Sequence, residues 1–554
     1  MKLNPTMQHT LTKINTALIE GHEDALISGL ESVPLEQLLS EDNIACVRAR
    51  DKKSLILLLC SLAVSNDITP SRAQIWLDCY QSIVNKELTQ GITRLSEHNI
   101  LRKVVTSLAY GSPLQLGDLQ KIKGDHQHWW DAFELAIDNK AWATAVCALE
   151  TLGKKRTETI LWLQLAKRLA KRHALFMDES GIPFTDVNYQ SLSRLYALCI
   201  QAAQNANATE LASALAHLRA RCLEMGGEYE EAIRLLKQFN KGKQAIPAHM
   251  GIARNHCRKG DLPASIQALD QALTEFKYLE TYGDDHKDLQ AAIAPARAPD
   301  TPFDVRSASR ALSDLAGIFN EIDLKFFLVS GTLLGYEREG QLLDHDKDID
   351  IGVIGWEKQY DICLALQKSN KFTISAHFLK GHASHYIPIQ HNATGSWIDI
   401  FIYFDQGDKL VTGVDFFFGY RQTFAFTPFE LKPVSFLGVD MYVPSDTDLN
   451  LTENFGNWRE PDASYISHLE SPSTMNKGGL EHLLTARLTA LGAIIQRKPK
   501  KLRKVVEILK LYADRPCAMP EPLLQSLLTI ATNFDGTQAP ASLLETSLTE
   551  PLHA

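Results

Sequence analysis

Two aspartates separated by one residue are the part of the sequence best suited to chemistry. Asp348 and Asp350 lie in Asp348-Ile-Asp-Ile-Gly-Val353, where polar and apolar residues alternate as they do in a strand. Alternation puts both carboxylates on one face of the strand and the isoleucines on the other. Two neighbouring carboxylates repel each other unless a cation lies between them, and Mg²⁺ and Mn²⁺ prefer oxygen ligands. The pair therefore predicts a divalent metal site, against the alternative of a solvated strand face.

A third aspartate, Asp399, lies in a second alternating run, Trp397-Ile-Asp-Ile-Phe401. Its flanking isoleucines again point away from the carboxylate. If the two strands are neighbours, three carboxylates converge on one metal site. Asp348, Asp350 and Asp399 are therefore the predicted metal ligands and the predicted catalytic residues.

A turn upstream of these aspartates has features of a phosphate site. Ser330, Gly331 and Thr332 follow an apolar strand pattern at 325–329 and open a helix. The first turn of a helix offers free N–H groups and a positive dipole end, glycine permits close approach, and the hydroxyl groups add donors. Carboxylates, a metal and a phosphate-binding turn together favour phosphoryl transfer.

Four ordered motifs between about residues 305 and 465 resemble the LicD and fukutin family of the nucleotidyltransferase superfamily. They are Ser330 to Gly335 with Arg338, Asp348-Ile-Asp350, Ile398-Asp399-Ile400-Phe401, and Leu451 to Gly456 with Trp458 and Pro461. Two departures are Phe455 in place of a tyrosine and Thr332 in place of the serine of the wider superfamily. Neither departure removes a predicted metal carboxylate.

The resemblance implies a phosphotransferase that moves a phospho-alcohol, such as an alditol phosphate or phosphocholine, from a CDP-activated donor to a hydroxyl of a cell-surface glycan. It also implies a metal on Asp348 and Asp350, with Asp399 completing the metal shell or accepting a proton. Ser330, Gly331, Thr332 and Arg338 would hold a phosphate, although Arg338 also fits a solvated helix charge. Two alternatives stay open: transfer of a nucleotide itself to a small molecule or protein, and a catalytically inactive scaffold.

The pattern along the 554 residues predicts a multidomain chain. Apolar residues recur at helical spacing through an all-α half at 1–290, and Gly227–Ile233 is echoed 33 residues later by Gly260–Ile266. That period is typical of tetratricopeptide repeats, whose arrays bind protein partners. A proline-rich linker at 291–304 precedes an α+β nucleotidyltransferase-fold domain at 305–480, which opens with a helix at 304–320. A helical C-terminal extension and tail follow at 481–554.

Composition indicates which class of partner and which cellular compartment to expect. A net charge of -9 argues against nucleic acid as a partner, and nine cysteines without a Cys-x-x-Cys pair are typical of a reducing compartment. The longest apolar run, about 12 residues, is shorter than the roughly 20 that cross a bilayer. These features predict a cytoplasmic protein, soluble or peripheral at the inner face of a membrane, acting on a glycan that could be lipid-linked.

Two further runs carry alternatives. An aromatic run from Phe416 to Phe426 fits a core strand, or a wall on which a base or sugar stacks. A basic run, Arg497 to Lys504, precedes a short apolar stripe and fits either a solvated helix end or a surface for anionic lipids.

Overall fold

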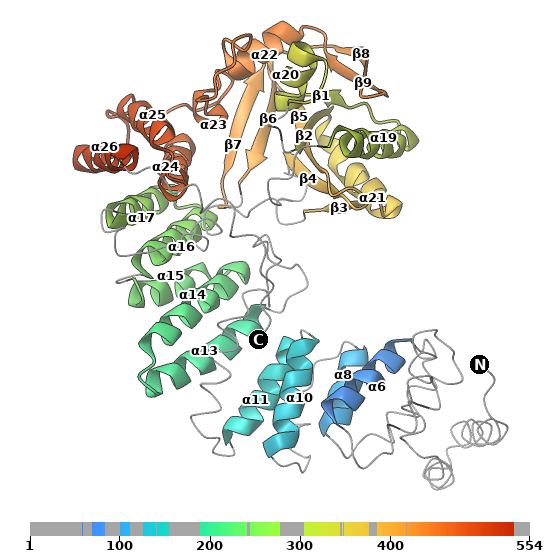
Figure 1. Cartoon of the computed structure of the whole chain (residues 1–554), viewed down its shortest axis with the longest axis vertical. Coiled ribbons are helices and arrows are strands. Elements are labelled where there is room, and N and C mark those ends of the chain that lie inside the picture. Colours follow the sequence, from blue (N-terminus) through green and yellow to red (C-terminus); the bar gives the residue numbers. More distant parts are fainter. Residues whose placement is uncertain are drawn as a thin grey trace, which may run out of the picture. The chain divides into compact units, whose positions relative to one another are not determined.

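The computed structural model describes residues 58, 62, 69–82, 100–110, 126–139, 141–154, 189–240, 244–276, 304–343, 346, 348–375, 385–416 and 418–536 (Figure 1). Residues 291–303 of the predicted linker and the predicted tail after residue 536 lie outside this part of the chain. The chain divides into two compact units, residues 1–175 with 186–222 and residues 176–185 with 223–554.

The first unit is helical wherever the structure describes it. Its core contains large side chains with no exposed surface, including Trp76, Trp129 and Tyr196. This confirms the predicted helical character of the N-terminal half. The helices are α6 (Pro70–Ser82), α8 (Ile100–Tyr110), α10 (His126–Asp138), α11 (Trp142–Lys154), α13 (Tyr189–Asn205) and α14 (Thr209–Met225), whose last turn belongs to the second unit.

The two self-similar segments lie at turns between consecutive helices. Gly227 separates α14 from α15 (Tyr229–Gln238), and Gly260 separates α16 (Ala245–Arg258) from α17 (Leu262–Glu275). Both glycines have a left-handed backbone, with φ of +82° and +90°, which glycine adopts without a steric penalty. The echo therefore marks two equivalent helix–turn–helix connections, whereas their assignment to tetratricopeptide repeats stays a prediction.

A nine-stranded mixed sheet forms the centre of the second unit (Figure 1). Its main order is β3-β4-β5-β2-β1-β9-β8, and the β6–β7 hairpin extends from the end of β5. β2 and β5 run parallel, whereas β1 runs antiparallel to β2. The strands are β1 (Phe327–Leu328), β2 (Asp348–Ile354), β3 (Phe372–Ile374), β4 (Tyr386–His391), β5 (Trp397–Gln406), β6 (Lys409–Asp415), β7 (Arg421–Phe426), β8 (Leu431–Phe436) and β9 (Val439–Pro444).

Helices connect and cover these strands. The predicted helix at 304–320 is α19, and the Asp304 carboxylate caps it by accepting hydrogen bonds from the backbone N–H groups of Arg306 and Ser307. The remaining elements of this region are α20 (Ser330–Glu339), the 3₁₀ helix η4 (Trp356–Lys358), α21 (Gln359–Ser369), α22 (Thr447–Phe455) and α23 (Ser467–Glu470), with α19 spanning Val305–Glu321.

Alternation along β2 and β5 gives the sheet two different faces. Ile349, Ile351, Ile398 and Ile400 are fully buried in one core, together with apolar residues of α19 and α21. The opposite face carries Asp348, Asp350 and Asp399, followed by a smaller cluster. This aromatic cluster is defined here as Phe327, Tyr403, Leu410 and Phe426, with Phe401, Phe424 and Phe429 packed against it. The apolar face fixes the register, because a slip of one residue would turn the aspartates into the isoleucine core.

Three C-terminal helices pack against the preceding helical segment. They are α24 (Leu480–Ile495), α25 (Pro499–Lys510) and α26 (Glu521–Gly536). α24 packs on α17, where the fully buried Arg487 guanidinium donates from Nε and Nη2 to the Asp270 carboxylate at 2.6 and 3.1 Å. The C-terminal helices therefore belong to the same compact unit as α15–α17 and the sheet.

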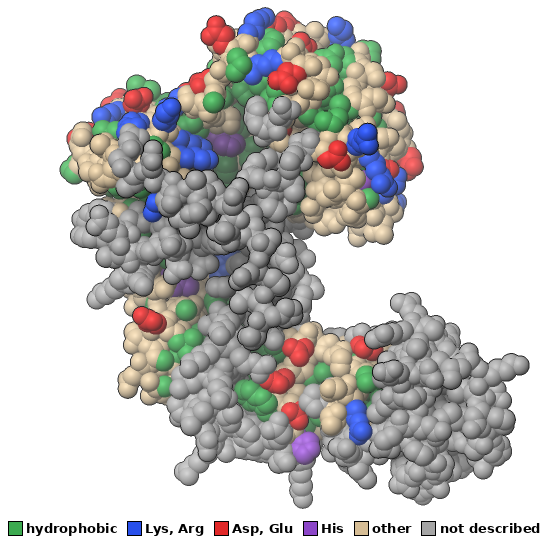
Figure 2. Space-filling model, viewed as in Figure 1, with side chains coloured by type: hydrophobic (Ala, Val, Ile, Leu, Met, Phe, Trp, Pro, Cys, Tyr) green, Lys and Arg blue, Asp and Glu red, His purple; other side chains and the backbone are tan. Residues whose placement is uncertain are grey.

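Lys and Arg side chains gather over α25 (Figure 2). Part of the predicted basic run has internal partners. Lys504 Nζ contacts Glu470 Oε2 at 2.9 Å and Asp462 Oδ2 at 3.5 Å, and Arg503 donates to the Ala531 carbonyl at 3.3 Å. These two residues join α25 to α23 and α26. No helix in the described part of the chain is long and apolar enough to cross a bilayer.

Candidate active site

The three predicted carboxylates converge on the face of β2 and β5 that lies opposite the isoleucines. Asp350 of β2 lies directly opposite Asp399 of β5 in the parallel register, and Asp348 lies two residues earlier on β2. One carboxylate oxygen from each aspartate lies within 4.8 Å of the others. Within the described residues, this arrangement gives three hard oxygen ligands at one point, as Mg²⁺ and Mn²⁺ require.

The start of α20 orients Asp350. The backbone N–H of Gly331 donates to Asp350 Oδ2 at 3.0 Å, and the backbone N–H of Asp350 donates to the hydroxyl oxygen of Thr332 at 2.7 Å. Thr332 is fully buried. Gly331 and Thr332 of the predicted phosphate turn therefore fix the carboxylate and the strand. Ser330 carries the partly exposed hydroxyl group of the turn.

Ser330 has an unusual backbone. Its φ of +47° lies in the left-handed region, which a residue with a side chain adopts at a steric cost. The residue begins α20 directly after the extended Val329, so this conformation makes the sharp change from strand to helix. It allows the helix to begin beside the three carboxylates.

Like charges and burial act together on Asp350. Burial raises the pKa of the Asp350 carboxyl well above its usual range, and the neighbouring Asp348, Asp399 and Asp346 carboxylates raise it further. The Gly331 N–H opposes this pKa shift because it stabilises the charged form. A divalent cation among these carboxylates would relieve the repulsion, so the donor set fits the predicted metal.

Two residues of this site did not stand out in the sequence. Tyr386 of β4 donates its hydroxyl to Asp399 Oδ2 at 2.9 Å, and Asp399 is only 5% exposed. Asp346 lies beside Gly331, since a Cβ on that glycine would come within 3.2 Å of both Asp346 carboxylate oxygens. The acidic segment before Asp348 was a signal for Asp346, whereas the partner of Asp399 follows only from the pairing of β4 with β5.

Arg338 contacts the fourth sequence motif. Its Nη2 donates to the carbonyl oxygen of Trp458, and so links α20 to the chain after α22. Trp458 is 8% exposed, belongs to the main core and donates its indole N–H to Asp448 at 3.0 Å. Leu451 is fully buried in the same core. The fourth motif therefore packs the helix that carries the phosphate turn.

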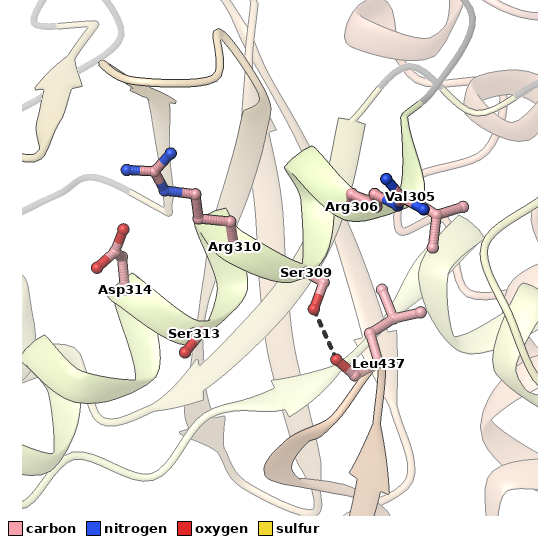
Figure 3. Close-up of a pocket in the computed structure, with 7 residues that line it drawn as sticks. All are labelled: Val305, Arg306, Ser309, Arg310, Ser313, Asp314 and Leu437. Atoms are coloured by element: carbon pink, nitrogen blue, oxygen red, sulfur yellow. Dashed lines mark hydrogen bonds between the residues drawn. The ribbon is translucent and has the colours of Figure 1, made fainter.

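A separate hollow of about 630 Å³ lies along α19 (Figure 3). Arg306 and Arg310 lie at different ends of it, and the Ser309 hydroxyl donates to the Leu437 carbonyl at 2.7 Å. Because α19 packs against the isoleucine face of the sheet, this hollow is not on the carboxylate face. It is therefore distinct from the predicted metal site.

Comparison with known proteins agrees with this geometry. Residues 323–446 match the family model described as "LicD/FKTN/FKRP, nucleotidyltransferase domain", so this part of the chain is a LicD-type domain and the predicted resemblance is confirmed. Among curated proteins, the chain is similar to proteins named "Ribitol-5-phosphate transferase FKTN". The human protein is 25% identical over 175 residues, the Macaca fascicularis protein 26% over 175 residues, and the mouse protein 26% over 203 residues.

These matches are partial. They cover 31% of this chain for the human and macaque proteins and 36% for the mouse protein. The chain spans 38–41% of the length of these relatives. The similarity is therefore to a domain, and that domain contains all three converging aspartates.

Proposed function

We propose that this protein is a metal-dependent phosphotransferase that moves a phospho-alcohol from a CDP-activated donor to a hydroxyl of a cell-surface glycan. The observation that carries the proposal is the convergence of Asp348, Asp350 and Asp399 beside the start of α20. The LicD-type match and the name of the relatives, which specifies ribitol 5-phosphate, support an alditol phosphate as the transferred group.

The three aspartates would hold Mg²⁺ or Mn²⁺. A bound divalent cation would neutralise charge on the donor diphosphate and its CMP leaving group. Ser330 would donate from its hydroxyl to a phosphate oxygen, and Gly331 would let that phosphate approach because it lacks a Cβ. Arg338 stays a predicted phosphate ligand, although its contact with the Trp458 carbonyl supports a second, positioning role.

The proposed transfer balances in one displacement. The acceptor hydroxyl oxygen bonds to the phosphorus that carries the alcohol, the bond from that phosphorus to the CMP oxygen breaks, and CMP leaves. The acceptor proton passes to a carboxylate, for which Asp399 is the proposed general base. The hydrogen bond from Tyr386 engages Asp399 Oδ2, so it orients the carboxylate towards the other two.

The finer assignments belong to the same proposal. The mixed sheet with α20 before β2 would be a nucleotidyltransferase fold, and the helical segments would be a tetratricopeptide-like array that recruits a protein partner. We propose a cytoplasmic enzyme, with Arg497 and nearby lysines of α25 available for an anionic inner membrane face. These cations would suit a lipid-linked acceptor.

A nucleotide-transfer reaction is the second candidate, and the words "nucleotidyltransferase domain" in the matching family model favour it. The two reactions differ in the leaving group, which is CMP in the first and pyrophosphate in the second. An inactive scaffold is the third candidate.

Ligand-dependent thermal stability separates these candidates. The full chain is melted with Mg²⁺ or Mn²⁺ and CDP, CTP, ATP, UDP or GDP. A ligand at 100 times its dissociation constant stabilises the fold by about 2.7 kcal/mol. A metal-dependent shift selective for CDP and lost in Asp348→Ala supports phospho-alcohol transfer, whereas selectivity for ATP or CTP supports nucleotide transfer. Absence of any shift, confirmed by direct binding, would favour the scaffold.

A further inference from the structure

The β6–β7 hairpin carries an uncharged polar row on one of its faces. Thr412 of β6 lies opposite Phe424 of β7, and Phe424 lies opposite Thr474 in an isolated antiparallel bridge. Directly opposite side chains in antiparallel pairs share a face, so the three residues form one row. Gln422 lies two residues from Phe424 along β7 and therefore faces the same way. Thr412, Gln422 and Thr474, with Phe424 between them, are called the hairpin row below.

The polar atoms of this row are buried and unsatisfied. Thr412 Oγ1, Gln422 Oε1 and Thr474 Oγ1 have no hydrogen-bond partner within the described structure, and the three residues are 3%, 2% and 7% exposed. Gln422 uses its other end, because Nε2 donates to the His468 carbonyl at 2.6 Å. Buried polar atoms without partners are costly and uncommon in native proteins. Three such atoms lie on one face of the hairpin.

The opposite face of the same hairpin is satisfied. Arg421 and Asp415 are cross-strand neighbours, and the guanidinium donates from Nε and Nη2 to the two Asp415 oxygens at 2.8 and 3.2 Å. The charged pair therefore points away from the hairpin row. His468 adds no charge near neutral pH, because burial, with a smaller contribution from Lys501, lowers its pKa to about 4.

The hairpin row adjoins the carboxylate face of the sheet. Phe424 and Phe426 pack in the aromatic cluster with Tyr403, which lies on the same face of β5 as Asp399. β6 pairs antiparallel with β5 from Gln406–Lys409 to Phe404–Val411, and Thr412 follows directly after the last pair. The row therefore begins beside the aromatic cluster, which shares the face of β5 that carries Asp399.

We propose that the hairpin row binds the polyhydroxylated part of a substrate, an alditol or sugar. Hydroxyl groups can donate to Gln422 Oε1 and exchange hydrogen bonds with both threonines, and the half-buried Phe424 ring suits the apolar face of a carbon chain or sugar ring. The absence of charge in the described row matches a neutral polyol better than a phosphate. The 473–475 segment, which carries Thr474, is held against β7 by two backbone hydrogen bonds of 2.9 Å each, from the Ala425 N–H to the Ser473 carbonyl and from the Met475 N–H to the Thr423 carbonyl.

This inference rests on the proposed transferase function. Two substrates of that reaction contain a polyol. The polyol is either the alditol of the donor or a sugar of the acceptor. Thr412→Val and Thr474→Val remove the hydroxyl groups while keeping side-chain volume. Thr423→Val is the matched control, because Thr423 alternates onto the opposite face of β7.

The first measurement is binding of free ribitol and of glucose to the full chain by saturation-transfer NMR, without nucleotide or metal. We expect at least one probe to bind the wild type and the Thr423→Val control. Thr412→Val and Thr474→Val should weaken that binding by roughly 3- to 10-fold, as expected for one neutral hydrogen bond. Binding of neither probe to the wild type would overturn the inference. So would unchanged binding in both threonine variants.

The second measurement separates the two sources and tests the fold. A raised KM for CDP-ribitol with unchanged kcat assigns the row to the donor alditol, and a raised KM for the glycan assigns it to the acceptor. Urea unfolding should show Thr412→Val at least as stable as the wild type, because no internal hydrogen bond is lost. Probe binding in the absence of any transfer would contradict the proposed function and leave the polyol site standing.

Discussion

The hydroxyl oxygen of Thr332 accepts a 2.7 Å hydrogen bond from the backbone N–H of Asp350. This bond joins the first turn of α20 to the strand that carries two of the three converging carboxylates. The Gly331 N–H adds a second link to the Asp350 carboxylate at 3.0 Å. The turn that resembles a phosphate site thus also sets the position of Asp350, a predicted metal ligand.

Thr332→Val should therefore destabilise the second unit. It leaves the Asp350 N–H buried without an acceptor, which costs about 1–3 kcal/mol. Thr332→Ser keeps the oxygen and should restore most of the lost stability. Urea unfolding of both variants measures the difference in the free energy of unfolding. Equal stability of the valine variant and the wild type would show that the bond contributes nothing to stability.

Gly335 and Gly317 offer a matched pair of glycine substitutions in helices. A Cβ on Gly335 would come within 2.5 Å of the Gln341 carbonyl oxygen and 3.1 Å of the Leu343 backbone nitrogen, whereas Gly317 has open space. Gly335→Ala should cost about 1–3 kcal/mol, because backbone must move. Gly317→Ala in α19 should stabilise by up to about 1 kcal/mol, because alanine favours helix. Thermal unfolding that ranks the two variants in the reverse order would contradict this packing.

Arg338→Met tests whether the guanidinium acts on the fold or on the donor. The variant keeps an apolar stem but loses the hydrogen bond to the Trp458 carbonyl. The two proposed roles of Arg338 predict a stability loss of about 1–2 kcal/mol together with a dissociation constant for CDP raised by about tenfold. Calorimetric titration with CDP and Mg²⁺ measures the second effect. An unchanged affinity would contradict the role of Arg338 as a phosphate ligand and leave the positioning role.

His468 should make stability depend on pH in the mildly acidic range. Burial, with a smaller contribution from Lys501, lowers its pKa to about 4, below the usual value near 6.5. Between these two values the unfolded chain binds a proton that the folded chain excludes, so stability falls as the pH drops through this window. The loss is at most roughly 3 kcal/mol at the acidic end.

The matched variant for this measurement is His468→Gln. The wild type and the variant are unfolded with urea at pH 6.5, 5.5 and 4.5. Their difference isolates His468 from His249 and His482, whose pKa values burial also lowers. Parallel pH profiles for the two proteins would show that His468 titrates normally.

Local patterns predicted most of the sheet elements that build the site. Alternating residues gave strands at 348–353 and 397–401, and the structure has β2 and β5 there. The convergence of Asp399 with Asp350 needed the parallel register of β2 and β5, which sequence spacing does not encode. The resemblance to a known family supplied the order of the motifs.

Other features depend on contacts between distant segments. The Tyr386–Asp399 and Arg338–Trp458 hydrogen bonds join residues 13 and 120 positions apart. The aromatic run was ambiguous because its members lie in different places. Phe424 and Phe426 lie in a strand that packs on the carboxylate face. Phe416 stacks on Tyr420 in the hairpin turn, with 4.7 Å between the ring centroids. The periodicity of the sequence could not predict the hairpin row, because Thr412 and Thr474 each pair with Phe424 of β7 from distant segments.

CMP release by Asp350→Asn and by the wild type tests whether the three converging aspartates carry out phospho-alcohol transfer. The full chain is incubated with CDP-ribitol, Mg²⁺ and a glycan acceptor, and Asp361→Asn on the exposed side of α21 is the control. We expect metal-dependent CMP release and a new phosphodiester for the wild type and the control. Asp350→Asn should release almost none, yet be at least as stable without metal, because it removes a carboxylate whose pKa burial and like charges raise. Full turnover by Asp350→Asn, or no CMP release by the wild type, would contradict the proposed function.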